Sequence, residues 1–174
     1  MNKIIYPDTP LYPGVQELEI SVSGDTTISN YPIWWEDTIT LYNKYEDKQT
    51  NLITWYRTVL TNCFWKATGN KVSVGDIKID TKALICRMPK NEKYLNIPEW
   101  EKLPNDQMSE YFTLRQGDIV VKGEVEDEIN EYQSGYRSSD FIEKYRTYGC
   151  FQINHIGINV GSGKCLEHYY ISGE

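Results

Sequence analysis

The residues best placed for chemistry lie near the end of the chain, where glycines and a lysine follow each other closely. Gly161-Ser162-Gly163-Lys164 suggests a phosphate-binding loop, whose backbone amides and lysine would hold a nucleotide phosphate. The spacing is wrong, because that motif needs a glycine five residues before Gly163 and position 158 is an isoleucine. Only ten residues follow Lys164, too few to complete the fold that carries such a loop. These residues therefore predict a hairpin turn rather than a nucleotide site.

Histidines and cysteines in the same region have the side chains that zinc or a Cys–His catalytic pair would use. The four are Cys150, His155, Cys165 and His168, and His155 could face His168 across a terminal hairpin. Their spacing along strands scatters them, and no close pair of ligands would fix a tetrahedron. We therefore expect no metal site and no cofactor. The chain's four cysteines form no CxxC pair and follow no signal peptide, so we expect reduced, structural thiols.

The acidic run from Glu124 to Glu131 could supply paired carboxylates for acid–base catalysis or ligands for calcium. It lacks the order of a calcium-binding loop, and no aromatic-lined cleft is implied around it. The sequence also contains neither a serine nucleophile elbow nor a dinucleotide-binding glycine fingerprint. We expect an exposed negative surface here and a protein that is not an enzyme.

The elements that must position any site are strands. From Asp37 to Lys66, apolar and polar residues alternate along two arms, as they do in half-buried strands. A polar stretch from Glu46 to Asn51 joins the arms and is expected to form the solvated tip of a hairpin. Further strands are expected at 72–74, 77–79, 83–88 and about 118–122, with a second hairpin over 150–172.

One helix is expected near residues 139–147, capped by Ser139 or Asp140 and with Phe141, Ile142 and Tyr145 on one apolar stripe. Residues 89–113 contain three prolines and predict a long loop that Trp100 anchors to the body. Six to eight short strands, one short helix and long loops indicate a mainly β fold, either a small β-barrel or a sandwich.

The chain of 174 residues is predicted to hold a single β-barrel-like domain at residues 34–174. Residues 1–33 predict an extended N-terminal arm, because prolines interrupt it and only Leu18–Val22 alternates as a strand would. Such an arm has no core of its own. It either contacts a neighbouring subunit or wraps over its own barrel.

Composition narrows the class of partner. The net charge is −7 and the isoelectric point about 4.9, so tight binding to a phosphate backbone is not expected. The 14 tyrosines and five tryptophans suit protein interfaces as well as sheet faces. No run of about 18 apolar residues occurs, so we do not expect a membrane span.

Several segments, taken in order, resemble the small neck proteins of tailed bacteriophages, the head-closure (stopper) and head–tail connector group. The first is the strand Asp37–Tyr42 with its partner at 55–60, and another is the Gly117-Asp118 strand. The full set comprises residues 37–42, 55–60, 63–65, 84–89, 117–124, 138–140 and 166–173. Together they cover most of the chain from residue 37, and their order carries the resemblance.

The resemblance implies a virion structural protein, a β-barrel subunit of a homo-oligomeric ring in the phage neck. The ring would join the portal-side adaptor to a tail terminator or tail tube protein, and would line or close the DNA channel. DNA would pass without specific binding, and no membrane would be involved. The protein would be made in the host cytoplasm and reside in the virion.

Two alternatives remain open. A tail-completion or minor capsid protein belongs to the same class, whereas a monomeric β-barrel binding carbohydrate or peptide would use exposed Trp34, Trp35 and Trp100 as stacking platforms. For the ring subunit, contacts are expected in the arm, the hairpin tip and the long loop. The residues predicted there are Tyr12, Glu46, Asp47, Lys48, Gln49, Thr50, Asn51 and Trp100.

Overall fold

The hairpin predicted from alternation lies at the centre of the fold. In the computed structural model, which describes residues 32–74, 77–160 and 167–173, β1 (Asp37–Glu46) pairs antiparallel with β2 (Ile53–Val74). The polar tip predicted at residues 46–51 does connect the two strands. Ile39 and Leu41 of β1 are fully buried, as their alternation indicated.

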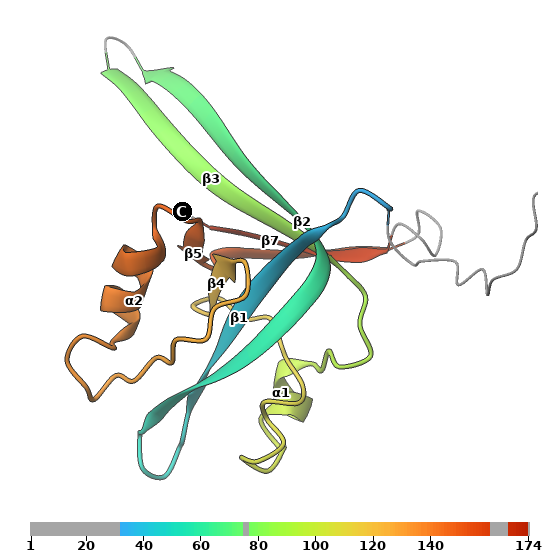
Figure 1. The fold of residues 1–174 in the computed structure, drawn as a ribbon, viewed down its shortest axis with the longest axis vertical. Helices are drawn as coiled ribbons and strands as arrows, with labels where there is room; N and C mark the ends of the chain where they lie inside the picture. The colour runs from blue at the N-terminus through green and yellow to red at the C-terminus, as the bar shows by residue number, and fades with distance from the viewer. Residues whose placement is uncertain (1–31, 75–76, 161–166, 174) are drawn as a thin grey trace, which may run out of the picture.

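β2 is much longer than the sequence indicated. It runs for 22 residues and pairs with β3 (Ile77–Pro89), and the two project from the body as a long hairpin (Figure 1). The strands predicted at 72–74, 77–79 and 83–88 are therefore parts of these two strands. Lys66, Ala67 and Gly69 are exposed, so this stretch of β2 is held by backbone pairing and carries no alternating pattern.

The remaining strands complete a mainly β architecture, as predicted. Within the described residues, seven antiparallel strands form a curled half-barrel sheet, in the order β5-β4-β1-β2-β3-β7-β6. The four shorter strands are β4 (Ile119–Lys122), β5 (Cys150–Gln152), β6 (His155–Asn159) and β7 (His168–Gly173). The turn predicted at 161–163 lies outside the described residues.

The sheet curls because β2 belongs to two halves of it. The first part of β2 pairs with β1 as far as Cys63, and the second part pairs with β3 from Phe64 onward. The pairing is irregular next to Asn62, whose φ of 58° is left-handed. Such bulges bend a strand and increase its twist.

Two apolar clusters stabilise the fold on opposite faces of the half-sheet that contains β1. The inner cluster lies inside the curl and includes Ile39, Leu41 and Phe151. The outer cluster forms where α2 (Ser138–Tyr145) packs over β1 and β4, with the ring of Phe141 4.9 Å from that of Tyr42. The loop 123–137 and α2 thus cover the outer face of this half-sheet (Figure 1).

Two helices are present among the described residues where one was expected. α2 lies close to the predicted range, but its N-cap is Arg137, and neither Ser139 nor Asp140 caps it. The Asp140 carboxylate instead accepts a hydrogen bond from the Gly135 amide. The second helix, α1 (Ile97–Trp100), is a single turn inside the predicted long loop, with a proline in its first turn.

Candidate functional site

The first part of β2 has an unpaired edge. β1 occupies one side of residues 53–63, while β3 leaves the sheet after Pro89 and pairs only from Phe64 onward. On the side where β3 would continue, no strand of the described chain follows. An exposed strand edge presents backbone donors and acceptors to any extended peptide, and proteins usually protect it.

Hydrogen bonds show which amides point to this open side. The Ile53 amide donates to the Tyr132 phenol oxygen at 2.6 Å, so it faces away from β1. On β1, the Lys44 amide likewise faces away from β2, because it donates to the Asp118 carboxylate at 2.9 Å. Lys44 lies opposite Trp55, and hydrogen-bonded and non-hydrogen-bonded pairs alternate along an antiparallel ladder. The outward set on β2 is therefore Ile53, Trp55, Arg57 and Val59.

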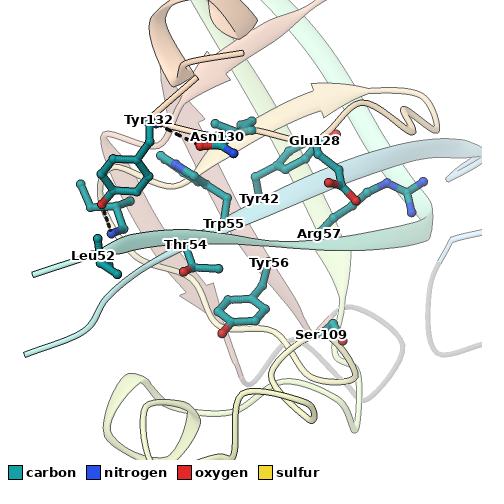
Figure 2. Close-up of a pocket in the computed structure, with 12 residues that line it drawn as sticks. Tyr42, Leu52, Thr54, Trp55, Tyr56, Arg57, Ser109, Glu128, Asn130 and Tyr132 are labelled. Atoms are coloured by element: carbon teal, nitrogen blue, oxygen red, sulfur yellow. Dashed lines mark hydrogen bonds between the residues drawn. The ribbon is translucent and has the colours of Figure 1, made fainter. Parts of the chain in front are cut away.

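The open edge lies in a groove of about 590 Å³. Figure 2 shows Trp55 and Asn130 on one side of the β2 ribbon and Tyr56 and Ser109 on the other. The groove therefore has one wall from the segment 128–132 and another from the long loop, with the strand edge between them. We call this feature the β2-edge groove; the lining set is Tyr42, Leu52, Ile53, Thr54, Trp55, Tyr56, Arg57, Ser109, Glu128, Ile129, Asn130 and Tyr132.

The walls of the β2-edge groove are fixed by specific contacts. The Trp55 indole donates to the Glu131 carboxylate at 2.9 Å, and the Arg57 guanidinium donates to the Val125 carbonyl. At one end, Leu52 and Tyr132 are half or more exposed. A pre-formed groove with backbone partners and apolar rims is suited to binding an extended strand.

The structure brings together two of the three segments predicted as contacts. At the tip, Asp47 accepts hydrogen bonds from the amides of Gln49 and Thr50, and these bonds lower the pKa of its carboxyl. Lys48 reaches Glu101 in the long loop at 3.3 Å. The remaining tip residues, Glu46, Gln49, Thr50 and Asn51, are exposed, and Tyr12 lies outside the described residues.

Trp100 anchors the long loop, as predicted, but it offers no surface to a partner. Its side chain is fully buried, its ring packs against Tyr45 and Tyr56, and its indole donates to the carbonyls of Met108 and Tyr111. The expectation that it is an exposed stacking platform is wrong, because the loop folds around it. Trp35 is buried as well, against Phe64, which leaves Trp34 exposed at 67%.

Asp118 is a buried carboxylate that sequence reasoning did not single out. One of its oxygens accepts from the Lys44 amide, and the other accepts from the Asn43 side chain and the Arg115 amide at 2.8 and 3.0 Å. Burial raises its pKa to about 6, against the lowering effect of these bonds. Because all these partners are structural, the carboxylate ties β1 to the turn before β4. The Gly117-Asp118 dipeptide was the available signal, and it indicated only a bend.

The described histidines and cysteines do not assemble a chemical site, and Cys165 lies outside the described residues. In the register of β6 and β7, His155 lies opposite Ser172 and His168 lies opposite Asn159, so the two histidines do not face each other. Among the described residues, no group of three metal-ligating side chains comes together. Cys63, Cys86 and Cys150 are buried free thiols, as predicted, and burial raises the pKa of Cys150 to about 12.

Comparison with known proteins places this half-barrel with an open strand edge in a family. The model described as a family of unknown function (DUF6751) matches residues 34–174, most of the chain. The chain belongs to this family. Neither a curated protein nor a solved structure matches it. Among the described residues, no helix has the length and apolar character needed to cross a bilayer.

Proposed function

We propose that this protein is a structural subunit of a tailed-phage neck, a ring component between the portal-side adaptor and the tail. The observation that carries the proposal is the open edge of β2 in its groove. A subunit that is complete on its own rarely leaves such an edge unprotected, whereas an assembly subunit uses it for a neighbour.

Other features support the same proposal. The β2–β3 hairpin projects beyond the body (Figure 1), which suits a segment that reaches a neighbouring subunit. Ile33, Trp34, Tyr148 and Ile158 are large apolar side chains that are more than half exposed. The net charge of −7 suits a channel through which DNA slides without being held.

The alternative was a monomeric β-barrel that binds carbohydrate or peptide, and its carbohydrate form loses its main support. It needed three exposed tryptophans, and two of them are buried in the structure. A single exposed ring at Trp34 does not make a platform for a sugar chain.

The proposal is tested by asking whether purified tailed particles contain the chain and where it lies in them. Fab fragments raised against the purified protein would be bound to the particles and imaged by electron cryo-microscopy. We expect the label as a ring at the junction of capsid and tail. Label confined to the capsid surface or tail tip, or particles that lack the chain, would contradict the proposal. The proposal also expects DNA to pass through the ring without being bound. Purified rings that bind and retard duplex DNA tightly at physiological salt would contradict this.

A further inference from the structure

The β2-edge groove has room and hydrogen-bonding groups for one more strand. Outward amides and carbonyls at Trp55, Arg57 and Val59 make no hydrogen bond to another described residue. The Tyr132 phenol satisfies the amide of Ile53 and so marks one end of the open stretch. A strand added here would extend a ladder that already exists rather than form a new one.

We propose that the β2-edge groove binds residues Glu17–Ser23 of a neighbouring copy of this chain as an additional antiparallel strand. The inference rests on the self-assembly in the proposed function, but it does not require the phage neck. Thirty-one residues precede the first described residue, and within them only Leu18–Val22 alternates in the way that a strand requires.

The length and the pattern of this segment match the edge. In an antiparallel arrangement, Ser21, Glu19 and Glu17 come opposite the open residues Trp55, Arg57 and Val59. With Ile20 opposite Tyr56, the apolar residues Leu18, Ile20 and Val22 lie on the side of the groove that Tyr56 and Ser109 line. Directly opposite residues in an antiparallel pair share a face of the sheet.

Charge is complementary in the same register. Glu19 comes opposite Arg57, whose guanidinium lies 3.6 Å from Glu124 and is about one-third exposed. A carboxylate there would give the guanidinium a second anionic partner. Ser21 comes opposite Trp55, next to the polar wall that Glu131 and Asn130 help to form.

The length of chain between the proposed strand and the first described residue favours a strand from a neighbouring copy over one from the same chain. Every strand pair in this sheet is antiparallel, and an antiparallel segment would end with Ser23 at the Ile53 end of the groove. The described chain starts at the other end, where Trp35 stacks on Phe64. The nine residues Gly24–Pro32 span about 31 Å at full extension. The 11 residues Thr54–Phe64 cover about 36 Å along the strand.

Residue-resolved amide hydrogen exchange on the full-length protein tests the inference. The outward amides of Trp55, Arg57 and Val59 should exchange about tenfold more slowly at millimolar than at micromolar protein. The amides of Tyr56 and Thr58, which face β1, are an internal reference that should not change with concentration. Ser21→Pro, which removes the amide that would pair with Trp55 in this register, should return the outward amides to fast exchange at both concentrations.

Thr27→Pro is the matched control, because it places the same residue in the same arm but outside the proposed strand. It should leave the protection intact. Protection of the outward amides that is independent of concentration would overturn docking of a neighbour, and fast exchange at both concentrations would overturn docking altogether. Neck localisation with unprotected edge amides would refute this inference and leave the proposed function standing. Protected edge amides in a protein that is absent from the neck would refute the proposed function and leave this inference standing.

Discussion

The Tyr132 phenol oxygen accepts the hydrogen bond of the Ile53 amide at 2.6 Å, across 79 positions of the chain. This contact is a cap on a strand edge, because it occupies the first outward-facing donor of β2 and leaves the following ones open. It also holds the segment 128–132 against the hairpin, where Trp55 donates to Glu131. One end of the open edge is therefore set by this phenol, and the other by the start of pairing with β3.

Removing that phenol should lengthen the open edge. Tyr132→Phe deletes the acceptor but keeps the ring, so we expect a loss of about 0.5–1.5 kcal/mol in unfolding free energy. Hydrogen exchange at a single amide is a more direct test than global stability. The Ile53 amide should exchange faster, while amides facing β1 keep their rates. Tyr136→Phe is the control, because Tyr136 is also more than half exposed and its phenol makes no hydrogen bond to a described residue. Equal exchange at Ile53 in both variants would contradict the cap.

Trp100 should matter for folding rather than for binding. Its ring is fully buried between Tyr45 and Tyr56, so Trp100→Ala should lower the unfolding free energy by about 3–5 kcal/mol. Trp34→Ala removes an equally large but exposed side chain, and should change stability by less than about 0.5 kcal/mol. Chemical denaturation of both variants measures the difference. Similar losses in the two would refute the anchoring role of Trp100.

Strands could be predicted where buried and exposed residues alternate along the sequence. They could not be predicted where only backbone hydrogen bonds between exposed strands hold the chain. Ile39 and Leu41 are buried on one face of β1, so their spacing revealed the strand. Lys66 and Ala67 are exposed on β2, and no periodicity marks the extension of that strand into the long hairpin. The contact of Trp100 with the body was foreseen, but its aromatic partners come from the hairpin, which is distant in sequence.

The candidate site could not be read from the sequence, because it depends on where a neighbouring strand stops. The edge at Trp55 and Arg57 is open only because β3 leaves the sheet after Pro89. That proline marked the end of a strand, yet no residue pattern predicted the register between β2 and β3. Contacts were predicted at the hairpin tip instead, because the polarity of those residues can be recognised without knowing how the strands pair.

Gly173 is required where the sheet curls onto itself. A Cβ at this position would come within 2.0 Å of the Gln152 carbonyl oxygen and 2.6 Å of the Phe151 ring. Gly173→Ala must therefore push β7 away from β5, and we expect a loss of about 2 kcal/mol. In β6, Gly157→Ala meets nothing closer than 3.6 Å and provides the control. Thermal unfolding that shifts equally in the two variants would contradict this close approach.

Asp118 should make the folded protein less stable as pH rises, which is the opposite of the usual effect of a carboxyl group. Burial raises its pKa from 3.8 in the unfolded chain to about 6 in the folded one, so the folded state holds the proton more tightly. Its contribution to stability is therefore fully present below the unfolded pKa and is lost as pH rises through 6. The loss amounts to about 3 kcal/mol. Urea unfolding at several values between about pH 4 and pH 6.5 measures it, with Asp118→Asn as the reference that removes this titration. A difference between the two proteins that stays constant across that range would contradict the assignment.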